Sequence, residues 1–193
     1  MASFELIAIA ASAGGLNALT QVLSALPRDF PVAILVVQHL DPRHRSLMAD
    51  ILGRRTPLKV AQATHGERVQ RGTVHVAPPD NHLLVDSEGV LTLTHTELVH
   101  FVRPSADLLF ESAAASFRER AIAVVLSGSG SDGAMGVNAI KKMGGTVIVQ
   151  DKETSEFFGM PSAAQQTGSV DFILPLAEIA PALQTLVAGD PPR

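Results

Sequence analysis

Three continuous runs of aliphatic residues constrain the fold of this sequence more than any other feature. They are "FELIAIA" (residues 4–10), "PVAILVVQ" (31–38) and "AIAVVLSG" (121–128). None of them alternates between apolar and polar residues, so both faces of each predicted strand must be buried. Segments with helical periodicity separate the runs. This alternation predicts an α/β fold with a doubly wound, mostly parallel sheet and helices on both faces.

The remaining segments fit the same architecture. Shorter β-type runs are expected at 72–78, 146–150 and 170–175. The segments 82–86 and 90–95 flank "SEG" and should pair as a short antiparallel hairpin. Helices are predicted over 16–26, 45–55, 103–120, 132–143, 160–167 and 176–188. No repeat or linker interrupts the pattern, so we expect residues 1–193 to form a single domain.

Composition excludes several classes of protein. The chain has no cysteine, which rules out disulfides and thiolate chemistry and is typical of a cytoplasmic protein. A net charge of −4 argues against a nucleic-acid partner, because such proteins usually carry a basic excess. No apolar stretch approaches the roughly 20 residues that span a bilayer, so we expect no membrane insertion.

Polar residues stand where the three apolar runs end. Ser12 follows the first run, His39 follows the second, and Asp132 lies in the Gly-rich turn "SGSGSDG" after the third. In open parallel sheets, sites form at the carboxyl ends of the strands. We therefore expect these three side chains to lie at one edge of the sheet.

This set of residue types fits nucleophilic catalysis. A Ser hydroxyl becomes an effective nucleophile when a neutral imidazole accepts its proton, and a carboxylate can orient that imidazole. The sequence around Ser12 reads A-x-S-x-G, which differs by one small residue from the G-x-S-x-G nucleophile turn. The chain order Ser, His, Asp differs from the Ser, Asp, His order of α/β-hydrolases, which argues against that fold family.

Other interpretations of these residues exist. Each residue alone has an ordinary structural role, as a helix cap, a buried imidazole or a turn residue. The segment "AASAGGL" could also bind a phosphate at a helix N-terminus, but a dinucleotide site would place an acidic residue where Gln38 and His39 stand. None of the seven His forms an i, i+4 pair with an interposed Glu, so we expect neither a metal nor a cofactor.

The sequence resembles the catalytic domain of the chemotaxis protein-glutamate methylesterases, the CheB family. The resemblance rests on motifs in the same order along nearly the whole chain. These motifs are "IAIAASAGGL", "VVQHL", "GERVQRGTVHVAPPDNHLLV", "RPSADLLF", "VLSGSGSDGAMG" and "VIVQDKETSEFFGMP". It implies a serine esterase that hydrolyses glutamate γ-methyl esters on chemoreceptor helices and releases methanol. Deamidation of receptor glutamines is a second implied activity.

By position, the resemblance makes Ser12 the nucleophile, His39 the general base and acid, and Asp132 the orienting carboxylate. We expect the backbone N–H groups of Ala13 and Ser129 to form the oxyanion hole.

The motifs "RPS" and "EFFGMP" also point to a substrate-binding role. On that basis we expect Arg103, Phe158 and Met160 to contact the substrate, with core packing as the alternative for the latter two.

The chain departs from the family pattern at several points. Ala13 replaces a Thr that commonly follows the nucleophile, and Phe101 and Val102 stand where the family tends to have Arg-His. The sequence also shows no N-terminal receiver domain, which typical members carry. Two alternatives therefore stay open: a diverged, non-catalytic module that binds a helical partner, or a serine hydrolase acting on another ester.

Overall fold

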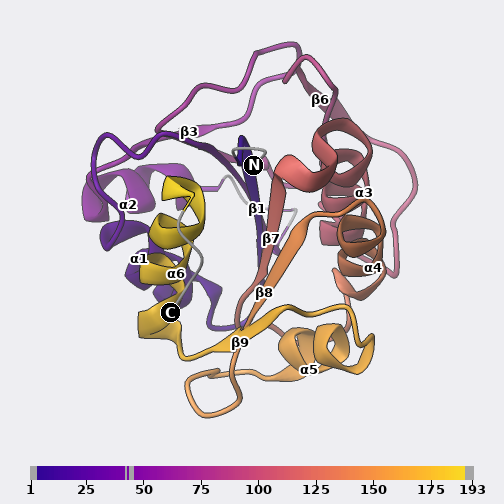
Figure 1. The fold of residues 1–193 in the computed structure, drawn as a ribbon. Coiled ribbons are helices and arrows are strands. Elements are labelled where there is room, and N and C mark those ends of the chain that lie inside the picture. Colours follow the sequence, from indigo (N-terminus) through magenta and orange to yellow (C-terminus); the bar gives the residue numbers. More distant parts are fainter. Residues whose placement is uncertain (1–3, 42, 44–45, 190–193) are drawn as a thin grey trace.

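A seven-stranded parallel sheet forms the centre of the molecule (Figure 1). The computed structural model describes residues 4–41, 43 and 46–189. The strand order is β3-β4-β2-β1-β7-β8-β9, and a separate antiparallel pair is formed by β5 and β6. The strands are β1 (Leu6–Ala11), β2 (Ala33–Gln38), β3 (Lys59–Gln62), β4 (Thr73–Val76), β5 (His82–Val85), β6 (Leu91–Thr94), β7 (Ala121–Val125), β8 (Thr146–Gln150) and β9 (Phe172–Leu174).

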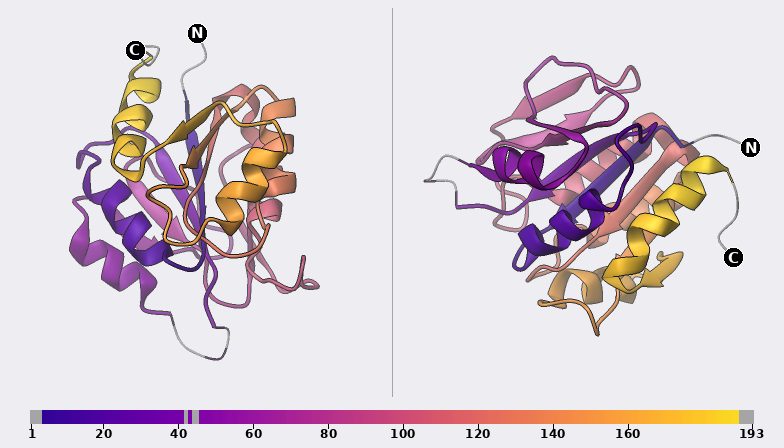
Figure 2. Two further views of the ribbon diagram at one scale, coloured as in Figure 1. Left: turned by 90° about the horizontal axis from the view of Figure 1, so that it is seen from below. Right: turned by 90° about the vertical axis from the view of Figure 1, so that its left-hand side faces the viewer.

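Helices cover both faces of the sheet, as Figures 1 and 2 show. One face is covered by α1 (Gly15–Ser24), α2 (Met48–Arg55) and α6 (Leu176–Ala188). The other is covered by α3 (Ala106–Phe117), α4 (Ala134–Lys142), α5 (Gly159–Gln166) and the β5–β6 hairpin. The apolar core is accordingly split into two clusters by the sheet, which confirms the predicted doubly wound α/β class.

The strand β1 shows how the sequence divides these clusters. Its six residues are all buried. Ile7 and Ile9 pack toward α1 and α6, whereas Ala8 and Ala10 face α3. Successive side chains of a strand point to opposite faces, so an uninterrupted apolar run is what a sheet covered on both sides requires.

Two local predictions need correction, and one strand was not among those expected. The strand β3 was not predicted, because Lys59 and Gln62 are exposed and the segment lacks a continuous apolar run. The helix expected over 103–120 spans only Ala106–Phe117, because Ser105 caps it and Arg118 adopts a left-handed φ of 51°. The helix expected over 45–55 begins at Met48, and residue 45 of that prediction lies outside the described residues.

The order of the strands reverses at β1: β2 and β4 are added on one side of it, and β7, β8 and β9 on the other. β2 lies on one side of β1 and β7 on the other, so the loops after β1 and β7 diverge toward opposite faces. Open sheets bind ligands in the crevice at such a reversal point. In the described part of the chain, no helix has both the length and the apolar character that a membrane span needs.

Close packing of α3 against α4 depends on Gly136. A Cβ built at Gly136 would lie 2.5 Å from Cβ of Phe110. We expect Gly136→Ala to destabilise the protein by about 1–3 kcal/mol through overpacking, although alanine favours helix formation by about 1 kcal/mol. The free energy of unfolding from urea titration measures this.

Gly53 in α2 provides the matched control. The nearest atom to a Cβ built there is 3.7 Å away, an ordinary contact. Gly53→Ala should therefore stabilise the protein by up to about 1 kcal/mol. Equal effects of the two substitutions would show that helix propensity, and not the contact with Phe110, decides the outcome.

Candidate active site

The main chain of Ser12 is held on both sides at the carboxyl end of β1. Its N–H donates to the carbonyl of Ser127 at 3.0 Å, which continues the pairing of β1 with β7. Its carbonyl accepts from the Gln38 side-chain amide at 2.8 Å and from the N–H of Gly15 at 2.8 Å. Gly14, with a φ of 74°, then turns the chain into α1. These bonds fix where the Ser12 hydroxyl can project.

His39 occupies the matching position at the end of β2. The register pairs Ala11 with Gln38, and the N–H of His39 donates to the carbonyl of Ala11 at 3.1 Å. Ser12 and His39 are thus the next residues on two adjacent parallel strands, which lie about 4.8 Å apart. Within the described residues the Ser12 hydroxyl makes no hydrogen bond, and catalytic hydrogen bonds often tighten only when substrate is bound.

The imidazole of His39 is bonded to Asp132. Its Nε2 lies 2.7 Å from Oδ2 of Asp132, and the ring is mostly buried. A carboxylate can only accept, so a neutral His39 carries its proton on Nε2 and leaves the Nδ1 lone pair free. That nitrogen is available as a base for the adjacent hydroxyl.

Asp132 accepts hydrogen bonds from the first turn of α3. Oδ1 accepts from the Ser105 hydroxyl and the N–H of Asp107, both at 3.0 Å, and Oδ2 accepts from the N–H of Ala106 at 2.6 Å. Burial by itself would raise the pKa of Asp132. The hydrogen bonds from His39 and from the two backbone N–H groups outweigh burial and hold that pKa below its ordinary value.

Asp107 makes the reciprocal contact to α4. Its Oδ1 accepts from the N–H of Gly136 at 2.7 Å. The N-terminus of α3 is therefore bonded to Asp132, from the turn before α4, and the N-terminus of α4 is bonded to Asp107 of α3. The helix dipole favours negative charge at both places. Burial raises the pKa of Asp107, and the nearby charge of Asp132 adds to this effect against the hydrogen bond from Gly136.

The turn after β7 lies directly against Ser12. A Cβ at Gly128 would sit 2.9 Å from Cβ of Ser12 and 2.4 Å from the sulfur of Met160, so only glycine fits. Within the described residues, the N–H groups of Ala13 and Ser129 donate to no acceptor. An oxyanion hole requires N–H donors that are free to bind the substrate oxygen, and these two groups meet that requirement.

The residues expected to contact substrate have other neighbours in this structure. Arg103 donates to Oδ1 of Asp80 at 2.6 and 2.9 Å and to the carbonyl of Thr96. Phe158 is half-buried at the start of α5, and Met160 has no exposed surface and packs against Gly128. Their role in substrate binding stays a prediction, and Met160 would have to act through Gly128 or move.

Several supporting residues were not predicted from the sequence. Gln38 holds Ser12, Ser127 donates to the carbonyl of Ala13 at 2.8 Å, and Gln150 accepts from the N–H of Ser127 at 2.8 Å. All three are buried polar residues at or just beyond the ends of apolar strands. The same positional signal that marks His39 could therefore have identified them.

No three His, Asp or Glu side chains in the described ranges are arranged to hold a metal ion.

Comparison with known proteins gives consistent matches. The model of the CheB methylesterase family matches residues 7–183. The crystal structure of the Thermotoga maritima CheB methylesterase catalytic domain is 36% identical and superposes with a TM-score of 0.92, covering 96% of this chain and 100% of that one.

Curated relatives agree with these matches. A protein of Leptospira interrogans is 40% identical over 92% of both chains. The relatives named protein-glutamate methylesterase/protein-glutamine glutaminase 1 of Cupriavidus pinatubonensis and protein-glutamate methylesterase FrzG of Myxococcus xanthus are 43% and 42% identical over 95% of this chain. The chain spans 54% and 55% of the length of those two. A match this extensive in sequence and in structure shows that the chain belongs to the CheB methylesterase family.

Proposed function

We propose that this protein is a serine esterase that hydrolyses glutamate γ-methyl esters on chemoreceptors. The observation that carries the proposal is the 2.7 Å bond between His39 and Asp132 beside Ser12, at the reversal point of the sheet. The matched relatives bear the corresponding name, which supports the substrate class. A non-catalytic module would have no need for an imidazole oriented in this way beside a hydroxyl.

The first half of the reaction forms a covalent ester. The Ser12 oxygen attacks the carbonyl carbon of the methyl ester while Nδ1 of His39 takes the hydroxyl proton. The oxyanion is stabilised by the N–H groups of Ala13 and Ser129. The tetrahedral intermediate then expels methoxide, which receives the proton from His39 and leaves as methanol. Asp132 stabilises the imidazolium throughout.

The second half regenerates the enzyme. A water molecule attacks the glutamyl ester as His39 removes its proton, and Ser12 leaves with that proton to give a free γ-carboxylate. A glutamine side chain can follow the same route with ammonia in place of methanol. We therefore include deamidation of receptor glutamines in the proposal, in line with the name of the Cupriavidus relative.

The substrate we propose is a helical segment of a methylated chemoreceptor, met in the cytoplasm. A depression beside Ser12 is lined by the apolar side chains of Leu16, Leu40 and Met48, which suits side chains next to the modified glutamate. The turn at His100 and Phe101 precedes Ser105, the cap of α3, by only a few residues. Phe101 is 94% exposed, and both residues have positive φ, of 47° and 68°. This strained turn presents an aromatic side chain to solvent.

Removal of the nucleophile tests the activity directly. Ser12→Ala should remove nearly all methanol release from methylated receptor fragments, leaving only roughly 10³-fold catalysis over water from binding and the oxyanion hole. Fluorophosphonate labelling of the folded protein should be lost as well. Ser24→Ala, at an exposed hydroxyl at the end of α1, should change neither. Undiminished turnover by Ser12→Ala would refute the assignment.

The pKa of Asp132 predicts a pH-dependent effect on stability. Because this pKa is lowered from its ordinary value of 3.8, the carboxylate stabilises the fold above that pH, and the stabilisation is lost as pH falls through the lowered pKa. Asp132→Asn should therefore reduce the free energy of unfolding at pH 7 by more than it does at pH 3. Urea titrations at the two pH values measure the difference, and a loss that is equal or larger at pH 3 would contradict it.

Phe101 tests whether the substrate is a protein surface. Phe101→Ser should raise KM for the methylated receptor because it removes an apolar contact, and should leave hydrolysis of a small methyl ester unchanged. Ile173→Ser, at an exposed residue of the edge strand β9, is the matched control and should change neither. An equal loss on both substrates would show that Phe101 acts on the site itself and not on receptor docking.

A further inference from the structure

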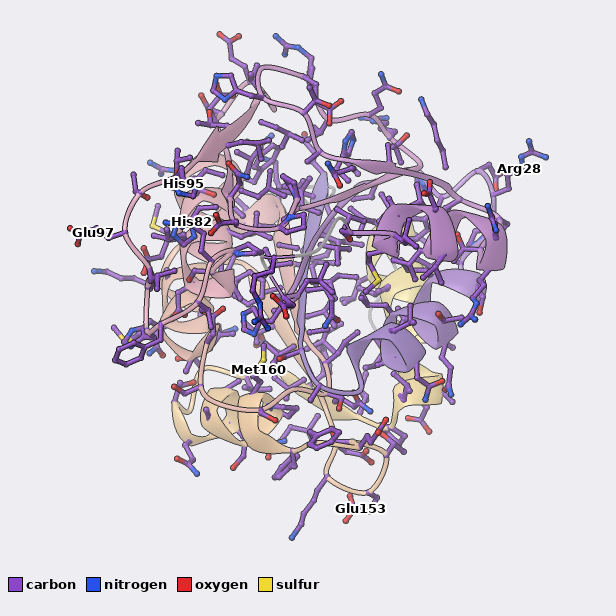
Figure 3. The ribbon with its side chains drawn as sticks, turned by 180° about the vertical axis from the view of Figure 1, so that it is seen from behind. Arg28, His82, His95, Glu97, Glu153 and Met160 are labelled. Carbon is purple, nitrogen blue, oxygen red and sulfur yellow. The ribbon has the colours of Figure 1, made fainter. Side chains whose placement is uncertain are left out.

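His82 is a fully buried imidazole that the proposed reaction does not use. It is the first residue of β5 and has 0% exposed surface. Its Nδ1 lies 3.1 Å from the N–H of Ser105, and its Nε2 lies 2.9 Å from the carbonyl of Glu97. Figure 3 shows His82 and Glu97 on the same flank of the molecule.

These two contacts determine the protonation state of His82. A backbone N–H can only donate and a backbone carbonyl can only accept. Nδ1 must therefore be the unprotonated nitrogen, and Nε2 must carry the proton. The ring is neutral in this arrangement, and both of its polar atoms are used.

The contact with Ser105 leads straight to the catalytic carboxylate. Ser105 is also fully buried, and its hydroxyl donates to Oδ1 of Asp132 at 3.0 Å. The next two N–H groups, of Ala106 and Asp107, donate to the same carboxylate. Only the Ser105 N–H points away from Asp132, to His82. The imidazole of His82 thus fixes the backbone N–H of Ser105. Ser105 is the first of the three consecutive residues that donate hydrogen bonds to Asp132.

We propose that His82 is a positioning residue for catalysis, which acts through Ser105 and the α3 N-terminus to orient Asp132 and hence His39. This inference rests on the proposed function for its kinetic readout. Because Ser105 is sealed from solvent, water cannot replace the ring nitrogen as acceptor. Loss of that acceptor should shift the α3 cap, and a displacement of about 1 Å in a catalytic group can reduce the rate about 10²-fold.

Two variants of His82 distinguish the contribution of Nδ1 from that of Nε2. In His82→Asn the amide oxygen can take the place of Nδ1 and accept from Ser105, whereas the contact with Glu97 is lost. In His82→Gln the amide nitrogen can reach the place of Nε2 and donate to Glu97, whereas Ser105 loses its acceptor. We expect kcat of His82→Asn to stay within about threefold of wild type. For His82→Gln we expect a loss of at least about tenfold in kcat, with KM within about twofold.

Thermal unfolding and a second histidine serve as controls. Both variants replace the same buried ring and each loses one of its two hydrogen bonds, so their Tm values should fall by similar amounts. His65 makes the same type of contact, with Nδ1 accepting from the N–H of Leu93 at 3.1 Å, at an exposed part of the hairpin. His65→Gln should leave kcat unchanged. Equal kcat losses for His82→Asn and His82→Gln, or no loss in either, would overturn the proposal.

A measurement on the wild-type protein keeps the test independent of folding and of substrate. Long-range ¹H–¹⁵N correlation spectra of the His rings should show His82 as the neutral form protonated at Nε2. A proton on Nδ1 at neutral pH would refute the proposal. If wild type released no methanol, the proposed function would fail, while this spectrum and the rate at which a fluorophosphonate labels Ser12 in the His82 variants would still decide the role of His82.

Discussion

Two buried carboxylates hold the catalytic side of the molecule together. Asp132 precedes α4 and accepts from the first turn of α3, while Asp107 in α3 accepts from the first turn of α4. The charges repel each other, but each faces a helix N-terminus whose N–H groups would otherwise lack partners. Neither helix can shift alone without leaving a buried charge unsatisfied, which is costly in a closely packed interior. The orientation of the imidazole of His39 depends on this arrangement.

The parallel sheet supplies the rest of the geometry. Ser12 and His39 follow paired positions of β1 and β2, so the ladder that forms the core also sets their spacing. Buried side-chain amides then extend the ladder beyond the strands, with Gln38 holding the Ser12 carbonyl and Gln150 holding the N–H of Ser127. Backbone bonds and buried side-chain amides together place the proposed nucleophile, base and oxyanion donors. A site built in this way is preorganised before any substrate arrives.

The sequence was sufficient for the fold class because a strand buried on both faces leaves an unmistakable aliphatic run. It was insufficient for β3, whose exposed Lys59 and Gln62 hide an edge strand within a polar segment. The placement of Ser12, His39 and Asp132 at strand ends was predictable from position alone. The contacts that support Asp132 were not, because Ser105 and His82 are joined to it only by the way α3 and the hairpin pack. Hydrogen bonds between segments that are distant in sequence produce no periodic pattern in the local sequence, so they cannot be predicted from it.

The outer strands of the sheet are short, and this limits edge-to-edge pairing with another chain. β3 has four residues and begins with a lysine, and β9 has three residues and is followed at once by Pro175. Exposed strand edges invite pairing with another chain, and short, charged or proline-bounded edges discourage it. The interior strands can therefore be almost purely aliphatic without offering a template for cross-β aggregation. The two short edge strands thus protect the most hydrophobic strands from intermolecular pairing.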